Sequence, residues 1–317
     1  MWLDDDGRTA VRSVKLPPAA AVRPGSPWSA ALERFAAQYA AARGREARAP
    51  AQDPLLIGAD PEFVLLRKDG RIVSAARYLD PRGAAGCDAV PVGRRLEYPV
   101  AELRPAPADS PAALAANIQR LLRQASGRIG EPGLRWLAGG MPVPGLALGG
   151  HIHLSGAWLS TRLLRTLDSC VAMPLALVEG PGSRSRRPRY GWLGDFRRQP
   201  HGGFEYRSPP SWLVSPAAAR AAFALALLAA RETWTLGSRY GDLPAEREPL
   251  VNAYYTGDMS GLRAGLDSFI DRITAAEAYP GLAQWIEPLL NAIRQGKTWD
   301  EHSDIRRKWG IPMAGRL

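Results

Sequence analysis

The segment Gly149-Gly150-His151-Ile152-His153-Leu154-Ser155 alternates imidazole with aliphatic side chains, which is the pattern of a β-strand. Residues two apart in a strand point to the same face, so His151 and His153 should project together while Ile152 and Leu154 pack on the other side. The chain has only four histidines, and two of them share this segment. Such a pair can ligate a metal or bind phosphate, although hydrogen-bonded structural histidines give the same pattern.

Three other segments repeat this arrangement with charged residues. Each is a short strand-like run in which two ionisable side chains alternate with apolar residues. The pairs are Asp60 and Glu62, Glu102 and Arg104, and Glu205 and Arg207. A sheet of these four segments would have one apolar face and one polar face, and burying the polar face without partners would be costly. Carboxylates with an imidazole suit Mg²⁺ or Mn²⁺, and arginine suits phosphate.

The composition describes a folded protein with a basic surface. Hydrophobic residues make up 46% of the 317 residues, enough for a sizeable core, and the formal net charge is +10. This charge suits nucleotide phosphates, an acidic peptide or another polyanion, although scattered surface arginines would also produce it. The two cysteines, Cys87 and Cys170, do not suggest a disulfide framework. We see no signal peptide and no apolar run long enough to span a membrane, and expect a soluble cytoplasmic protein.

The sequence lacks the common signatures of nucleotide binding and hydrolysis. It contains no GxxxxGK[ST], no GxGxxG after a strand, no GxSxG and no HExxH. A face of carboxylates, histidines and arginines remains. Such a face can serve phosphoryl transfer, in which a metal and arginines neutralise phosphate charge, or hydrolysis, in which a metal activates water.

Five short motifs follow one another along the chain. They are Gly58-x-Asp60-Pro61-Glu62-Phe63, Glu102-x-Arg104-Pro105, Gly150-His151-x-His153, Tyr190-Gly191…Gly194-x-Phe196-Arg197 and Glu205-Tyr206-Arg207-Ser208-Pro209. In this order they resemble the phage-type COOH-NH2 ligases, which are amidoligases of the glutamine synthetase/glutamate-cysteine ligase superfamily. The resemblance covers residues 55–213. It implies an α+β fold whose curved antiparallel sheet carries the active site on its concave face and helices on its convex face.

The resemblance also implies an activity and a set of site residues. It implies an ATP- and Mg²⁺-dependent ligase, with Mn²⁺ as a substitute, that joins a carboxylate to an amine through an acyl phosphate. The implied metal ligands are Asp60, Glu62, Glu102, His151 and Glu205, where Asp60 departs from the Glu-x-Glu common in the superfamily. The implied nucleotide-binding residues are His153, Arg104, Arg189 and Arg197. The implied catalytic residues are Glu62, Glu102, His151, Glu205 and Arg207, and Arg207 would hold the acyl-acceptor carboxylate or the transferred phosphate. Asp88 and Glu97 could assist, Glu97 as a base for the amine.

The order of predicted elements divides the chain into three regions. Residues 1–54 should form an N-terminal extension with a strand at 11–16 and one helix at 26–44. Residues 55–242 should form the amidoligase catalytic domain, and residues 243–317 a helical C-terminal segment with helices at 260–275, 282–294 and 300–309. Ser-Pro pairs predict that helices start at Ser26, Ser110 and Ser215. Helix 160–178 should bend at Pro174, and Pro61 suggests an edge strand or a bulge.

Two other functions stay open at this point. A metal-dependent hydrolase could use the same acids and histidines, and ATP binding would separate it from a ligase. A basic nucleic-acid-binding module would explain the charge, but the four glutamates and aspartates of the polar face would repel a phosphate backbone. Under the ligase interpretation the partners are a carboxylate and an amine, including those of a peptide or protein that is modified. We expect neither a membrane nor a nucleic acid as partner.

Overall fold

The computed structural model describes residues 2–3, 9–10, 25, 29–34, 36–37, 54–92, 95–187, 190–200, 202–237, 239 and 241–313. The chain forms two compact units, Met1–Gln52 and Asp53–Leu317. In the first unit, strand β1 (Trp2–Leu3) pairs antiparallel with β2 (Thr9–Ala10). Residues 29–34 and 36–37 are helical, which confirms the predicted helix over those positions. The predicted strand at 11–16 lies outside the described residues.

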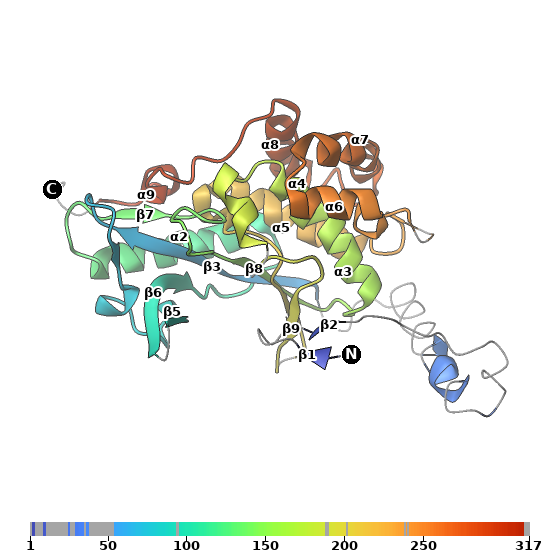
Figure 1. Ribbon diagram of the computed structural model, residues 1–317, viewed down its shortest axis with the longest axis horizontal. Coiled ribbons are helices and arrows are strands. Elements are labelled where there is room, and N and C mark those ends of the chain that lie inside the picture. Colours follow the sequence, from blue (N-terminus) through green and yellow to red (C-terminus); the bar gives the residue numbers. More distant parts are fainter. Residues whose placement is uncertain are drawn as a thin grey trace. The chain divides into compact units, whose positions relative to one another are not determined.

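The second unit is built on an antiparallel sheet (Figure 1). Its strands in spatial order are β5 (Ala85–Val92), β6 (Arg95–Leu103), β3 (Leu56–Leu66), β8 (Gly150–Ser155), β10 (Phe204–Tyr206) and β9 (Phe196–Arg198). Two short strands, β4 (Ile72–Val73) and β7 (Arg135–Leu137), pair with the C-terminal end of β3. The long strand β3 therefore runs through the middle of the sheet and joins its two halves.

Pro61 lies inside β3 and pairs in register with Gly150 of β8, so its predicted place on an edge strand or bulge is wrong. The N–H of Glu62 donates to Gly149 O on the β8 side. Because successive backbone groups of a strand alternate in direction, the nitrogen of Pro61 faces β6. Pairing between β3 and β6 begins one residue later, at Glu62 opposite Glu102. The missing N–H of Pro61 thus removes no hydrogen bond from the sheet.

Helices account for most of the remaining chain. They are α2 (Pro111–Arg128), α3 (Thr161–Leu167), α4 (Met173–Ala176), α5 (Pro216–Arg231), α6 (Glu248–Thr256), α7 (Met259–Ala275), α8 (Ala283–Arg294) and α9 (Ile305–Trp309). The Ser110 and Ser215 side chains cap α2 and α5 by accepting from backbone N–H groups, as the Ser-Pro pairs predict. A π-helical turn at Asp168–Ala172 separates α3 from α4 just before Pro174.

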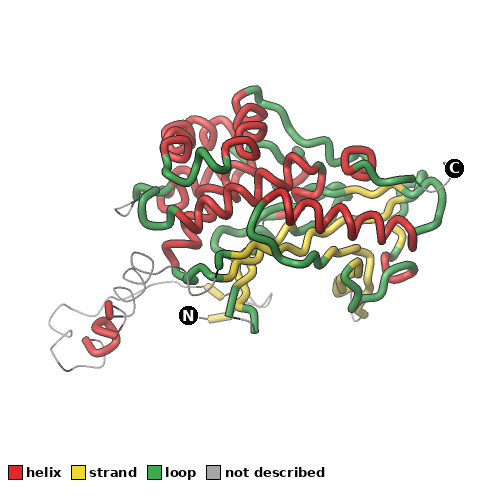
Figure 2. The backbone as a smooth tube through the Cα atoms, turned by 180° about the vertical axis from the view of Figure 1, so that it is seen from behind, coloured by secondary structure: helices red, strands yellow, loops and turns green. Residues whose placement is uncertain are grey.

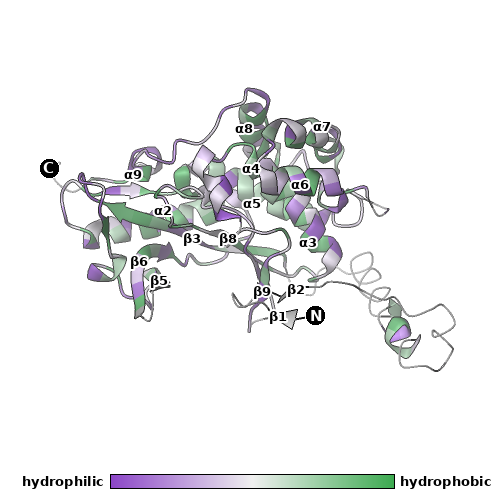
Figure 3. Ribbon diagram, in the orientation of Figure 1, coloured by the Kyte–Doolittle hydropathy of each residue, from purple (hydrophilic) through white to green (hydrophobic). Residues whose placement is uncertain are grey.

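The core lies between the apolar face of the sheet and the helices. Ile57, Phe63, Ile152, Leu154 and Phe204 are all at most 1% exposed, and all sit at alternate positions of their strands. Figures 1 and 2 show the helices on one side of the sheet, with β5, β6 and β9 curving away from them, and Figure 3 shows the apolar colouring of β3. The predicted α+β class with an antiparallel sheet is confirmed. In the described part of the chain, no helix combines the length and apolarity needed to cross a bilayer.

Candidate active site

The register of the strands brings the predicted site residues onto the face of the sheet that the helices leave open. Residues directly opposite each other in an antiparallel pair project from the same face. The opposed pairs are Asp60 and His151, Glu62 and Glu102, Glu205 and His153, and Glu205 and Arg197. Five strands, β3, β6, β8, β9 and β10, therefore contribute to one polar surface.

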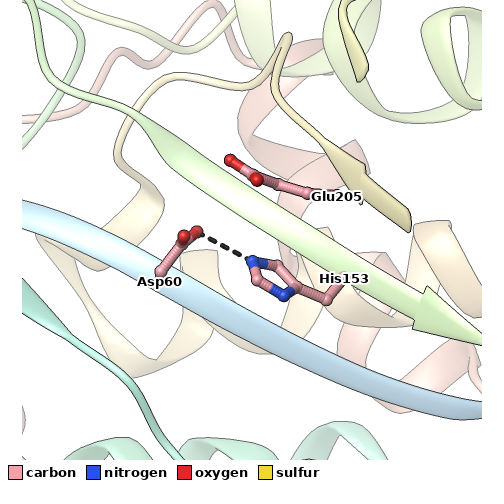
Figure 4. A group of neighbouring side chains, drawn as sticks. All are labelled: Asp60, His153 and Glu205. Atoms are coloured by element: carbon pink, nitrogen blue, oxygen red, sulfur yellow. Dashed lines mark ion pairs between the residues drawn. The ribbon is translucent and has the colours of Figure 1, made fainter. Parts of the chain in front are cut away.

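The first group on this surface consists of Asp60, His153 and Glu205 (Figure 4), and His151 lies close to Asp60 and Glu205. One oxygen of Asp60, Oδ1, lies 3.2 Å from both His151 Nδ1 and His153 Nε2. His151 Nδ1 is also 3.2 Å from Glu205 Oε1. Ligand atoms of Asp60, His153 and Glu205 all lie within 4.8 Å of one another, which is close enough to share a cation.

The second group consists of Glu62, Asp88 and Glu102, whose ligand oxygens also lie within 4.8 Å of one another. Glu62 accepts a hydrogen bond of 2.6 Å from the backbone N–H of Gly149, the residue before the histidine strand β8. Burial and the neighbouring carboxylates raise the pKa of Glu62, and burial together with Asp60 raises the pKa of Glu102 to about 8. Three carboxyl groups this close favour protonation unless a cation joins them.

The pKa of the buried His151 imidazole is raised as well. Burial alone would lower its pKa, but the nearby carboxylate of Asp60, together with those of Glu62 and Glu205, raises it to about 9. Burial would raise the pKa of Asp60, yet His151 and His153 hold it well below its usual range. A proton on His151 therefore compensates the acids of the first group.

The donor set fits a divalent cation. Asp60 Oδ1, Glu102 Oε2, His151 Nδ1 and His153 Nε2 are buried, and none has a partner in hydrogen-bonding geometry among the described residues. Asp60 Oδ1 lies 3.2 Å from a ring nitrogen of each histidine, so these atoms converge on one point. Carboxylate oxygens with one or two imidazoles are ligands that Mg²⁺ and especially Mn²⁺ accept.

Arginines close the β9–β10 side of the site. Arg197 donates to both oxygens of Glu205, from Nε at 2.8 Å and Nη2 at 2.9 Å, and Gln199 adds a third donor at 3.0 Å. Arg207 lies between two acids, with Nε 3.2 Å from Glu205 and Nη1 3.8 Å from Asp195. Glu205, which is fully buried, is thus surrounded by positive charge.

The other two arginines predicted to bind the nucleotide are Arg104 and Arg189. Arg104 contacts Glu102 and donates to the carbonyl oxygens of Gly83 at 2.9 Å and Pro81 at 3.1 Å, so it braces the loop before β5 as well as an acid of the site. Gly86 has no side chain, and an added Cβ there would collide with Arg104 Nη1. Arg189 lies outside the described residues.

The site residues line a cavity of about 760 Å³. Asp60, Glu102, His151, His153, Glu205 and three arginines form its polar wall, and Leu56, Pro105 and Pro107 lie along its other part. Asp88 and Gln199 also line the cavity. The sequence predicted only an assisting role for Asp88 and did not single out Gln199. The signal for Gln199 was its position two residues after Arg197, which is strand spacing. Glu97 is exposed on β6 and does not line this cavity.

Comparisons with known proteins identify relatives of the chain. The sequence model of the family described as "Phage phiEco32-like COOH.NH2 ligase-type 2" matches residues 57–311. No curated protein matches the chain.

Solved structures with a similar chain trace include a bifunctional glutathione synthetase from Pasteurella multocida, at 12% identity and a TM-score of 0.49. The match covers 80% of this chain and 49% of the synthetase, so the chain spans about half the length of that protein. Ligand-free GmaS matches at 15% identity and a TM-score of 0.41, over 84% of this chain and 73% of that one. A complex of GmaS with ADP matches at 16% identity and a TM-score of 0.34, over 80% and 74% of the two chains.

Proposed function

Because the chain belongs to the family of phage phiEco32-like COOH-NH2 ligases of type 2, we propose that it is an ATP-dependent ligase that forms an amide bond through an acyl phosphate. One observation carries this proposal: acids of both groups, Asp60 and Glu205 of the first and Asp88 and Glu102 of the second, line one cavity together with Arg197 and Arg207. Transfer of phosphate to a carboxylate brings two anions together, and such a face can hold both.

The acids and imidazoles would hold the metal. Asp60, His153 and Glu205 would bind one divalent cation and Glu62, Asp88 and Glu102 a second, with His151 beside the first group. When bound, Mg²⁺ or Mn²⁺ would supply positive charge to the β- and γ-phosphate oxygens of ATP. The hydrogen bond from Gly149 fixes the Glu62 carboxylate, so one ligand oxygen is already oriented.

The arginines would bind the anions that react. Arg197 is 60% exposed at its side chain and lies on the edge strand β9, so its guanidinium can turn from Glu205 toward a phosphate. Arg207, 29% exposed and placed between Glu205 and Asp195, is suited to the carboxylate substrate or the transferred phosphoryl group. A planar guanidinium binds either anion through two parallel hydrogen bonds.

The proposed reaction has two displacements. An oxygen of the substrate carboxylate attacks the γ-phosphorus of ATP, the bond to the bridging oxygen breaks, and ADP leaves with an acyl phosphate in place. The amine nitrogen then attacks the acyl carbon, phosphate leaves with the former carboxylate oxygen, and the nitrogen loses a proton. Arg197 and Arg207 would neutralise the phosphate in both steps.

Hydroxylamine trapping tests this proposal. The wild type is incubated with Mg²⁺, ATP, hydroxylamine and pooled carboxylates (amino acids and peptides), and we expect ADP formation together with a hydroxamate. Glu205→Gln should lower both by at least about hundredfold, since it removes a charged ligand at the centre of the site. Glu277→Gln, at an exposed glutamate of the turn after α7, is the matched control and should keep wild-type rates. Metal-dependent hydrolysis of a substrate without ATP consumption would instead support a hydrolase.

A further inference from the structure

A second cavity lies between the turn that follows β3, the start of β7 and helix α9. Its volume is about 670 Å³, and among the described residues it shares none of its lining with the active-site cavity. Sites for small ligands have volumes of roughly 300–1,000 Å³. Its basic lining residues are Lys68, Arg135, Arg306 and Arg307, against a single acidic one, Asp304.

Arg306 and Asp304 neutralise each other and form a rigid wall. Both are buried, and Arg306 binds the carboxylate through Nε at 3.0 Å and Nη2 at 2.6 Å. The same guanidinium donates to Leu134 O and lies 4.9 Å from the ring centre of Trp136. The only acid of the cavity lining is therefore already paired.

The other three cations, Lys68, Arg135 and Arg307, form no ion pair with a carboxylate in the part of the chain that the structure describes. The hydrogen bond that Arg135 makes runs to a carbonyl oxygen, that of His302, at 3.3 Å. Two further acids nearby are engaged elsewhere. Glu131 binds Arg67, and the Asp300 carboxylate accepts from the backbone N–H groups of the turn before α9.

We propose that this cavity is a second anion-binding site, which takes a ligand with at least two phosphate or carboxylate groups. Three like charges in one concave surface repel one another and attract anions, and a bound anion relieves that repulsion. Two guanidinium groups can each bind a phosphate or carboxylate through paired hydrogen bonds, and Lys68 adds a point charge. Six residues of nearly extended chain, about 20 Å, separate Glu62 from Lys68. A small ligand in this cavity would therefore not contact the two groups of proposed metal ligands. The inference does not depend on the proposed ligase activity.

Calorimetric titration of the full chain tests the site. The probes are pyrophosphate, citrate and a tri-glutamate peptide, at low salt and without ATP or divalent cations. We expect the Arg135→Ala/Arg307→Ala double variant to bind the preferred probe at least about tenfold more weakly, because it removes two of the three cations of the cavity that have no carboxylate partner. Lys68→Ala should weaken binding less.

Two control variants separate this cavity from other basic surfaces. Arg120→Ala/Arg123→Ala removes two exposed charges of α2, and Arg197→Ala removes one from the active site; both should keep the wild-type affinity. A preference for pyrophosphate would identify a phosphate-bearing ligand, and a preference for citrate or tri-glutamate a carboxylate-bearing one. The proposal is overturned if no probe binds, if the double variant binds as the wild type does, or if only Arg197→Ala weakens binding.

Discussion

Arg197 of β9 lies directly opposite Glu205 of β10 and binds both oxygens of its carboxylate, at 2.8 and 2.9 Å. Gln199, Arg207 and His151 place three more polar nitrogens within 3.2 Å of the same carboxylate. A carboxylate has about four lone-pair positions, and the hydrogen bonds from Arg197 and Gln199 fill three of them, while Arg207 and His151 lie close to the remainder. A metal that binds Glu205 must therefore compete with these groups. Arg197 is the most exposed of the charged ones.

Arg197→Ala should therefore change metal and nucleotide binding in opposite directions. In the absence of ATP we expect Mn²⁺ to bind about tenfold more tightly, because the competing charged hydrogen bonds are gone. ATP-dependent turnover should fall by about a hundredfold, since the guanidinium no longer reaches the phosphates. Mn²⁺ affinity is measured by electron paramagnetic resonance. Arg198→Ala, on the same strand but facing the other side, should leave both quantities unchanged, and weaker Mn²⁺ binding to Arg197→Ala would refute the competition.

Gly149→Ala should disturb the two groups of proposed metal ligands, because it displaces the imidazole of His151. A Cβ at Gly149 would lie 2.2 Å from His151 Nε2 and 2.8 Å from its Cδ2, and the ring is buried, so it must move. We expect Mn²⁺ affinity and turnover to fall by about 10–100-fold, as when a residue that orients a metal ligand is changed. The control is Gly127→Ala inside α2, where nothing lies within 4 Å of the added Cβ. That variant should be about 0.5–1 kcal/mol more stable and fully active, and wild-type affinity in Gly149→Ala would contradict the prediction.

The polar face of the sheet could be predicted from the sequence because a strand repeats every two residues. The spacing of His151 and His153, or of Asp60 and Glu62, is enough to place each pair on one face of its strand, whichever strand lies next to it. The Ser-Pro helix starts are local for the same reason, since Ser110 and Ser215 satisfy backbone donors within their own first turn. These parts of the fold needed no long-range information.

The grouping of the ligands could not be predicted, because it depends on register. Glu62 lies opposite Glu102 because β3 pairs with β6, a strand that follows much later in the sequence. Asp88 reaches the same group because the register of the β5–β6 pair shifts between Asp88 and Val90. The prediction that Pro61 marks an edge strand or a bulge failed for a related reason. A proline fits inside a strand where no neighbouring strand needs its N–H, and β6 pairs with β3 only from Glu62 onward. Helix α6 (Glu248–Thr256) was not predicted, and α9 is shorter than the predicted 300–309 because Asp300 holds a turn there.

Asp168 should make the protein less stable as the pH rises from about 4 to 6. Its carboxylate is fully buried in the π-helical turn, and Oδ1 accepts from Gly194 N at 2.8 Å and from Tyr206 Oη at 2.9 Å. Burial raises the pKa of Asp168 to about 6, although both hydrogen bonds act in the other direction. Between the unfolded and folded pKa values the native state binds a proton that the unfolded state has lost, so the free energy of unfolding falls as pH rises.

Asp168→Asn isolates this contribution, because its amide oxygen can accept from Gly194 and Tyr206 without titrating. Relative to the wild type, the variant should gain up to about 3 kcal/mol between pH 4 and pH 7, the equivalent of two pKa units, and then stay level. Urea unfolding at pH 4, 5, 6, 7 and 8 measures the difference. Parallel pH profiles for the two proteins would show that Asp168 does not titrate in this window.

Glu301 should be a main stabilising contact of the segment before α9. Its buried Oε1 accepts hydrogen bonds from Gly180 N at 2.7 Å, Ser183 Oγ at 2.8 Å and Gly140 N at 3.2 Å. A Cβ at Gly139 would lie 2.3 Å from the Glu301 carboxyl carbon, so the glycine makes room for it. Removing this acceptor leaves buried donors without a partner, each at a cost of about 1–3 kcal/mol.

Glu301→Ala should therefore lower the free energy of unfolding by about 3 kcal/mol or more, and Glu301→Gln, which keeps one oxygen acceptor, by about 1–2 kcal/mol. Urea unfolding followed by tryptophan fluorescence measures both changes. Glu277→Gln, at an exposed glutamate of the turn after α7, is the matched control and should stay within about 0.5 kcal/mol of the wild type. Since Glu301 does not line the active-site cavity, the folded fraction of Glu301→Gln should bind Mn²⁺ as the wild type does. Equal stability of Glu301→Ala and wild type would mean that water satisfies Gly180 and Ser183 in place of the carboxylate.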